Sequence, residues 1–212
     1  MSEIRLGRRA FLGVVGLGGL GLLLGSRIAR PLEDVLPAQG WRIYAINPPW
    51  PTFDPATWRL EVTGAVEKPL SLSWDEFTSL PTHRQTTTFH CVTGWTIDDV
   101  GWQGVPLQAL WDEAKPTADA KYANFVSLEK PYVDTLSMEQ TTLPNVILAH
   151  SMDGNPLTRA HGAPVRLVIP QMYGYKNVKW LHRIELVPKL EPGFWEQNGY
   201  DVDAWVGRSN GY

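Results

Sequence analysis

The sequence is poor in cysteine and in positive charge, and both shortages restrict what it can do. Cys91 is the only cysteine in 212 residues, which excludes an internal disulfide framework and a four-cysteine zinc or iron–sulfur site. Nineteen Lys and Arg face 22 Asp and Glu, a formal net charge of -3. A nucleic-acid-binding surface needs clustered basic residues and a high pI, so we expect no nucleic-acid partner.

Long apolar runs are also lacking. The one apolar, glycine-rich stretch covers residues 11–25, shorter than the ~20 residues that a membrane-spanning helix needs. The composition, 43% hydrophobic and 19% charged, is that of a globular protein rather than a disordered one. The length predicts one main domain with short extensions, since domains usually run about 100–200 residues.

The basic residues gather at the N-terminus. Residues 1–30 hold five basic residues and one acid, so the remainder holds 14 against 21, or -7. Arg8-Arg9 before an apolar run resembles a twin-arginine export signal, a route that carries folded chains. The alternatives are an ordinary secretory signal or a plain anchor helix. We expect residues 1–30 to direct the chain to the periplasm or another extracytoplasmic compartment, either cleaved or retained as a membrane anchor.

The remaining chain divides by composition. Residues 31–57 are rich in Pro and Trp and predict an extended arm that packs on the body. Residues 58–190 predict the main domain, and residues 191–212 a C-terminal extension packed on it. Apolar alternation, β-branched runs and capping signals predict many short strands and a few short helices. Strands are expected at 58–63, 70–73, 86–92, 125–128, 133–136, 146–150, 165–170 (central) and 178–187; helices at 74–80, 106–114 and 138–143; turns at 102–107 and 153–156. The predicted fold class is α+β and dominated by sheet.

Cys91 ends a predicted strand and enters the loop Thr93-Gly94-Trp95. A lone cysteine is often a small buried hydrophobe. A polar, partly open setting instead suits a reactive or metal-bound thiolate. A nucleophilic cysteine would need a histidine base, and no cysteine-hydrolase signature surrounds Cys91. The histidines available for that role are His90, His150, His161 and His182.

A second group of residues suggests an anion site. His161 precedes a predicted strand in which Arg166 lies among apolar residues. A buried guanidinium is costly without an anionic partner. That partner is either a phosphate, which a guanidinium grips with two hydrogen bonds, or one of the chain's own carboxylates.

The segment 173–180, Tyr-Gly-Tyr-Lys-Asn-Val-Lys-Trp, follows closely. Gly174 permits a tight bend and two lysines come after it. One interpretation is a solvated hairpin with surface lysines. The other is a cationic pocket that these lysines complete together with His161 and Arg166.

Seven short segments in this order resemble the sulfite-oxidase-fold, molybdopterin-dependent oxidoreductases. Within that family the resemblance is strongest to the bacterial periplasmic branch that includes the catalytic subunit of methionine-sulfoxide reductase. The match covers about residues 41–205. The segments are 58–66 with Pro69-Leu70, 91–95, 102–107, 153–157, 161–167, 173–174 with 178–181, and 193–196 with Gly199-Tyr200.

The resemblance implies a mononuclear molybdenum held by one pterin dithiolene and by Cys91, where a soft thiolate is a suitable ligand. It implies that His161, Arg166, Asn177, Val178 and Lys179 hold the pterin, with Ser127 and Asn47 as further contacts. The expected activity is oxygen-atom transfer to or from a small-molecule substrate such as a sulfoxide or another small organic oxide.

Sulfite oxidases carry arginines just after the metal cysteine, but residues 92–99 here have no basic residue and two acids, Asp98 and Asp99. This difference favours a neutral organic substrate. With Tyr173 and Tyr175, the two acids are the polar groups expected near it. No heme-binding signature is present, so the resemblance implies electron transfer with a separate redox partner such as a membrane b-type cytochrome. The alternatives are a cofactor-free binding or assembly module of the same fold, and a sulfite dehydrogenase.

Overall fold

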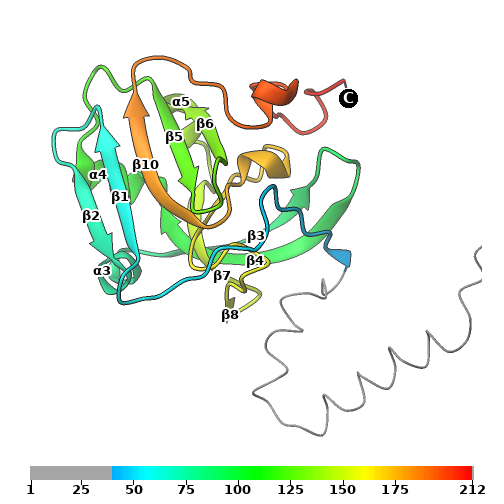
Figure 1. Cartoon of the computed structure of the whole chain (residues 1–212), viewed down its shortest axis with the longest axis horizontal. Coiled ribbons are helices and arrows are strands. Elements are labelled where there is room, and N and C mark those ends of the chain that lie inside the picture. The colour runs from blue at the N-terminus through cyan, green and yellow to red at the C-terminus, as the bar shows by residue number, and fades with distance from the viewer. Residues whose placement is uncertain (1–39, 212) are drawn as a thin grey trace, which may run out of the picture. The chain divides into compact units, whose positions relative to one another are not determined.

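Two five-stranded sheets form most of the body of the protein (Figure 1). The computed structural model describes residues 40–211, and residues 43–211 belong to one unit. The predicted export segment and residues 31–39 of the predicted arm lie outside the described residues. Residues 43–57 of the arm contain no helix or strand.

The first sheet has the order β2-β1-β10-β5-β6. Strands β1 and β10 are parallel, and the other neighbours are antiparallel. In β1, Leu60 and Val62 are buried while Arg59 and Glu61 are exposed, because successive side chains of a strand point to opposite faces. The strands are β1 (Arg59–Gly64), β2 (Leu70–Ser73), β5 (Tyr122–Ser127), β6 (Val133–Ser137) and β10 (Leu181–Val187).

The second sheet is antiparallel throughout, with the order β3-β4-β7-β8 and with β9 paired to β7. In Figure 1, β3 and β4 run across the direction of β1 and β10. This sheet ends at the predicted cysteine loop, because β3 stops one residue before Cys91. Its strands are β3 (His83–His90), β4 (Thr96–Pro106), β7 (Ile147–Met152), β8 (Asn155–Pro156) and β9 (Arg166–Val168).

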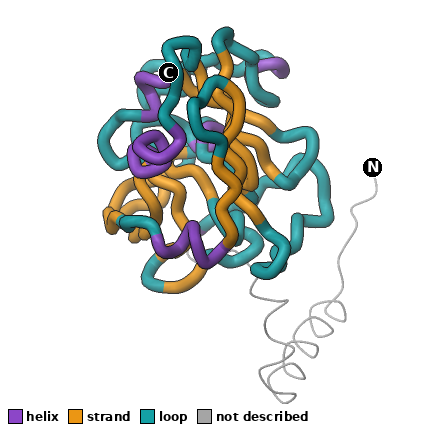
Figure 2. Tube along the Cα trace, turned by 90° about the vertical axis from the view of Figure 1, so that its left-hand side faces the viewer, coloured by secondary structure: helices purple, strands orange, loops and turns teal. Residues whose placement is uncertain are grey.

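Helices are few and short, as Figure 2 shows. Ser73 caps the first of them and forms the predicted capping box with Glu76, which satisfies main-chain N–H groups that a helix start leaves without partners. No helix in residues 40–211 is long and apolar enough to cross a membrane. The helices are α3 (Trp74–Ser79), α4 (Leu107–Ala114), α5 (Met138–Thr141) and the 3₁₀ turns η2 (Gly174–Lys176) and η3 (Glu196–Asn198).

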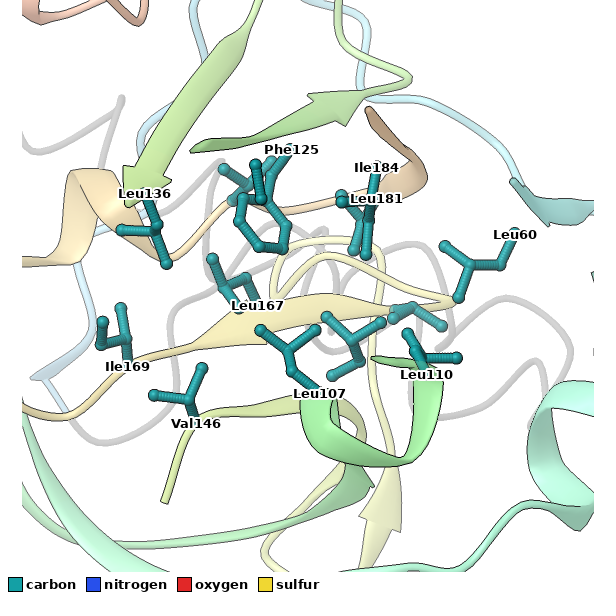
Figure 3. Packing of buried hydrophobic residues seen from close by; sticks show 14 of the residues in the cluster. Leu60, Leu107, Leu110, Phe125, Leu136, Val146, Leu167, Ile169, Leu181 and Ile184 are labelled. Carbon is teal, nitrogen blue, oxygen red and sulfur yellow. The ribbon is translucent and has the colours of Figure 1, made fainter. Parts of the chain in front are cut away.

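The apolar core lies between the first sheet and the layer formed by α4 and β9 (Figure 3). Phe125 and Ile184 contribute from the first sheet, Leu107 and Leu110 from α4, and Leu167 from β9, and all are fully buried. Burial of such side chains stabilises the fold by about 1.5–3 kcal/mol each. Strand β9 therefore carries Arg166 directly beside the core.

The predicted α+β, sheet-dominated class is confirmed, but three local predictions are wrong. Residues 102–107 were expected to form a turn, yet most of them belong to the eleven-residue strand β4. The strand at 165–170 was expected to be central, yet β9 has three residues and, within the described chain, pairs with β7 alone. The strand at 178–187 was expected to begin at Val178, yet β10 begins at Leu181 and residues 178–180 are irregular chain.

Gly104 explains why the sequence wrongly predicted a turn within β4. A Cβ at this position would lie 2.2 Å from the main-chain oxygen of Leu148 in β7. The glycine is required because the two strands approach each other closely, and it does not mark a turn.

Replacing Gly104 by Ala should therefore force β4 away from β7. We expect the free energy of unfolding to fall by about 1–3 kcal/mol, the range of overpacking substitutions, as measured by urea unfolding. Gly101→Ala is the control, because its Cβ would meet no atom closer than 3.3 Å. Equal losses in both variants would contradict this account of the strand contact.

Candidate cofactor site

Cys91 lies in a tight turn between β3 and β4. Its main-chain N–H donates to the Trp95 carbonyl at 2.9 Å, and its carbonyl accepts from the Gly94 N–H at 3.0 Å. The Sγ lies 3.2 Å from the Thr93 Oγ1, and the residue is half-buried. The thiol is therefore held at the sheet edge, partly open to solvent, as a thiolate ligand requires.

Phe89 connects this turn to the predicted anion site. Its ring lies 5.6 Å from the Trp95 ring and 5.8 Å from the guanidinium carbon of Arg166. The Trp102 ring of β4 lies 5.1 Å from the same carbon. Two neighbouring strands thus present aromatic rings to one guanidinium, an arrangement that favours a cation.

Main-chain carbonyls fix the orientation of Arg166. Its Nη1 donates to the His161 carbonyl and its Nη2 to the Asn177 carbonyl, each at 3.3 Å. The residue is only 3% exposed, and its Nε has no hydrogen-bond partner within the described chain. No carboxylate among residues 40–211 forms a salt bridge with it, so the interpretation in which Arg166 pairs with one of the chain's own acids is wrong for the acids that the structure describes.

Lys179 is the second cation of the site. Its Nζ donates to the Tyr44 carbonyl at 2.7 Å and to the Ala160 carbonyl at 3.4 Å, and it lies 4.2 Å from the Trp180 ring centre. Gly162 packs against its side chain, since a Cβ there would lie 2.8 Å from the Lys179 Cβ. The lysine therefore lies beside the turn that contains His161.

Burial weakens all three bases of the site, since water no longer stabilises their charged forms. Burial lowers the pKa of Arg166 to about 10 and, together with the Arg166 charge, that of Lys179 to about 7, although Glu129 partly offsets the latter. Burial and the charges of Arg166 and Lys179 lower the pKa of His161 to about 4. The site therefore holds closely spaced positive charge that an anion would stabilise.

Ser127 and Asn47 join this group through Glu129. The Ser127 Oγ donates to the Lys179 carbonyl at 2.8 Å and accepts from the Glu129 N–H at 2.9 Å. The Glu129 carboxylate accepts from the N–H groups of Ile46 and Asn47, at 2.8 and 3.0 Å. The arm is thereby attached next to the lysine, and the exposed Asn47 donates its side-chain amide to the Lys130 carbonyl.

Asn177 and Val178 support the site rather than open into it. The Asn177 Oδ1 accepts from the Ile169 N–H, and its carbonyl holds Arg166. The Val178 N–H donates to Lys176 and its carbonyl accepts from Leu167, while its side chain is fully buried. Both residues therefore have their main-chain groups engaged within the protein.

The structure thus brings seven of the eight predicted site residues into one network and places Cys91 next to it through Phe89. Lys176 departs from the prediction: it is neither a surface lysine nor part of the cationic pocket, because its ammonium turns toward Asp134 and Glu196. Within the described chain no histidine hydrogen bonds to the Cys91 Sγ. His150 instead packs against Trp74 and Phe77.

Of the four polar residues expected near a substrate, three hydrogen bond to other parts of the chain. Asp98 accepts from the Thr88 hydroxyl, and Asp99 is exposed on β4. The Tyr173 hydroxyl accepts from the Gly207 N–H, and the Tyr175 hydroxyl donates to the Asp201 carbonyl. The two tyrosine hydroxyls therefore bind the C-terminal segment.

Sequence reasoning missed Phe89, Trp102 and Glu129. The signal for Phe89 is its position two residues before Cys91, which puts both on one face of an extended chain. No sequence signal indicates Trp102 or Glu129, because their roles depend on how distant strands and the arm meet.

Comparison with known proteins identifies the class. The model of the oxidoreductase molybdopterin binding domain matches residues 47–195. The chain belongs to this family and is an oxidoreductase.

Several relatives lie within the same class. The oxidoreductase YuiH of Bacillus subtilis is 35% identical over 72% of this chain and 77% of its own length. The methionine-sulfoxide reductase catalytic subunits MsrP of Campylobacter jejuni and Gluconobacter oxydans are 32% and 29% identical. Those alignments cover 68% and 88% of this chain but 54% and 66% of the relatives.

The sulfane dehydrogenase SoxCD of Paracoccus pantotrophus shares the fold in a crystal structure. Its TM-score is 0.61 at 25% identity, over 65% of this chain and 40% of that one. The likeness confirms the sulfite-oxidase-type arrangement of sheets that the sequence predicted.

The residues present fit a phosphate-bearing cofactor. Arg166 is a buried guanidinium that lacks a carboxylate partner in the described chain and has an Nε without a hydrogen bond. A phosphate is the anion that such a fork of donors holds best. The half-exposed thiol near it supplies the soft donor that molybdenum accepts.

If an anion stabilises this site, sulfate should bind to the cofactor-free protein through Lys179. Affinity should fall as pH rises through about 7, where Lys179 loses its proton. Sulfate suits the test because it stays a dianion in this range. At tenfold excess over its dissociation constant, bound sulfate should add about 1.4 kcal/mol to the free energy of unfolding.

Lys179→Met should remove most of this gain and its pH dependence, measured by thermal unfolding with and without sulfate. Lys68→Met is the charge-matched control, because Lys68 is largely exposed. The same sulfate response in both variants would refute an anion site at Lys179.

Proposed function

We propose that the protein is an exported oxidoreductase that transfers an oxygen atom between a small organic substrate and a molybdenum bound to Cys91 and one pterin. The observation that carries the proposal is the position of the Cys91 turn, which adjoins through Phe89 a buried guanidinium without a carboxylate partner in the described chain. Membership of the molybdopterin-binding family supports a molybdopterin as the cofactor.

The residues of the site have distinct tasks in this proposal. The bound molybdenum supplies the two-electron redox chemistry. Cys91 holds it as a thiolate from a turn that the Trp95 carbonyl fixes. Arg166 and Lys179 bind the phosphate, and neutral His161 stands beside them as a hydrogen-bonding group.

Three further residues hold those groups in place. Asn177 orients Arg166 through its carbonyl, Ser127 fixes the main chain of Lys179, and Asn47 lies on the arm that Glu129 attaches. Val178 contributes by packing, since its main-chain groups are already paired. Oriented groups of this kind lose little freedom when a ligand binds, which raises affinity.

A neutral substrate such as a sulfoxide suits the surroundings of Cys91. The turn Val92–Trp95 contains no cation that could hold a dianion such as sulfite, and the acids Asp98 and Asp99 lie near the start of the next strand, β4. Reduction of a sulfoxide consumes two electrons and two protons and yields a sulfide and water. The MsrP relatives are named for a reaction of this class.

The electrons would come from a separate protein, for which a membrane b-type cytochrome is the expected kind. The MsrP relatives are named as catalytic subunits, which supports such a division of work. An extracytoplasmic location is proposed from Arg8-Arg9 and the apolar run that follows.

Cys91→Ala is the direct test of the metal site. The variant should fold, because the thiol's only side-chain hydrogen bond in the described chain is with Thr93. It should lose bound molybdenum, the visible absorption of the metal–sulfur centre and dye-coupled sulfoxide reduction, all of which the wild-type protein from a molybdenum-replete host should show.

Thr93→Val is the matched control and should keep the metal. A folded wild-type protein without molybdenum or pterin would favour a cofactor-free module of this fold. Sulfite-dependent dye reduction by the wild type would instead favour a sulfite dehydrogenase. A Cys91→Ala protein with full metal content and activity would contradict the assignment of the thiolate.

Replacing Arg8 and Arg9 together by Lys should keep the protein in the cytoplasm, because the twin-arginine route depends on the arginine pair. Cell fractionation with immunodetection measures this. Arg5→Lys is the control and should leave export unchanged. Unaltered export of the double variant would indicate an ordinary secretory signal.

A further inference from the structure

Lys176 lies in a second, separate cluster of buried charges. Its Nζ donates to the Asp134 carboxylate at 2.7 Å, to the Thr135 carbonyl at 3.0 Å and to the Glu196 carboxylate. The side chain of Lys176 is 1% exposed, and those of Asp134 and Glu196 are 2% exposed each. The cluster joins β6, η2 and the C-terminal segment around η3.

If both acids are ionised, this cluster has too few hydrogen-bond donors for its carboxylate oxygens. Lys176 has three protons and uses all of them. The second oxygens, Asp134 Oδ2 and Glu196 Oε2, are buried and have no partner within the described chain. Gly193 packs against them, since a Cβ there would lie 2.4 Å from Glu196 Oε2 and 2.9 Å from the Asp134 Cα.

The charges do not balance either. One ammonium and two carboxylates sum to -1 in a site from which water is excluded, where a bare charge costs several kcal/mol. The other titratable groups that act here do not correct this. Tyr132 lies near both acids and near Glu129, and Tyr175 lies next to Lys176. Arg166 acts on Tyr132 rather than on the acids.

We propose that Asp134 and Glu196 share one proton at neutral pH, which makes the cluster a neutral clasp between β6, η2 and the C-terminal segment. The shared proton supplies the donor that the two partnerless oxygens lack, and the remaining carboxylate charge offsets the ammonium. Burial raises the pKa of Asp134 well above its ordinary value, and Glu196 adds to this while Lys176 opposes it. The two acids keep the pKa of Lys176 raised even though burial alone would lower it.

The clasp also positions the chain segment 174–178, which contains a residue that orients Arg166. Lys176 directly precedes Asn177, whose carbonyl orients Arg166. The Tyr132 hydroxyl donates to the Tyr175 carbonyl at 2.5 Å, which fixes the same turn from the residue directly before β6. The proton-sharing claim stands on the protein alone, whereas this positioning role rests on the proposed function.

The shared proton predicts a specific pH dependence of stability in the cofactor-free full chain. In the unfolded chain both acids ionise near pH ~4, whereas the folded protein keeps one proton above that pH. Stability is therefore full below pH ~4 and falls as pH rises toward the raised folded-state pKa. Over that window the unfolding equilibrium constant should gain roughly tenfold per pH unit from this one proton.

Asp134→Asn and Glu196→Gln each remove the need for the proton and leave one carboxylate for Lys176. Both variants should lose the pH dependence that the shared proton causes. Their free energy of unfolding, measured by urea unfolding at a series of pH values, should therefore rise relative to that of the wild type as pH increases. The double variant leaves Lys176 without a counter-charge and should be less stable than either single variant. Glu139→Gln is the control, because Glu139 is an exposed acid on α5. Its free energy of unfolding should change with pH in the same way as that of the wild type.

Parallel pH curves for the wild type and both amide variants would overturn the proposal. If neither single variant folds, ¹³C NMR of the wild-type chain decides it. A side-chain carboxyl that is still protonated at neutral pH supports the clasp, and its absence refutes it. Neither measurement requires the cofactor, so a failure of the proposed function would leave them valid.

The positioning role is tested in the cofactor-loaded protein with Glu196→Gln and Glu196→Ala. Glu196→Gln should keep the bound pterin. In Glu196→Ala the pterin content should fall at least severalfold, and hydrogen exchange in residues 174–178 should be faster. Equal pterin content and equal exchange in both variants would refute a positioning role.

Discussion

The burial of Arg166 is the constraint on which the arrangement of this protein depends. A guanidinium beside an apolar core is tolerated because four separate parts of the chain converge on it. Phe89 and Trp102 face it from β3 and β4, and the carbonyls of His161 and Asn177 accept its hydrogen bonds. The same convergence brings the Cys91 turn to the site, since Phe89 lies two residues earlier on β3.

Two buried charge clusters of opposite sign lie along one short segment of chain. Arg166 of β9 and Lys179 form a cationic pocket in which no carboxylate of the described chain makes a salt bridge with either side chain, while Lys176 binds the two acids Asp134 and Glu196. The first imbalance suits a ligand from outside, because the pocket adjoins a half-exposed turn. The side chains of the second cluster are at most 2% exposed, which favours correction by a proton over correction by a ligand.

Local signals in the sequence predicted much of the fold. The alternation in β1 and the capping box at Ser73 depend on neighbouring residues, and both are confirmed. Gly104 misled because its cause is the approach of β7, 44 residues further along the chain. In the site, the cost of burying Arg166 indicated an anionic partner, either a phosphate or one of the chain's own acids, but the direction of Lys176 depends on where β6 and the C-terminal segment meet.

The central claim is that Cys91 and a pterin dithiolene together hold one molybdenum. X-ray absorption at the molybdenum edge counts the sulfur ligands of the bound metal directly. The account predicts three sulfur ligands in the wild-type protein, two from the dithiolene and one from Cys91. A spectrum of the wild-type protein with only two sulfur ligands would contradict it.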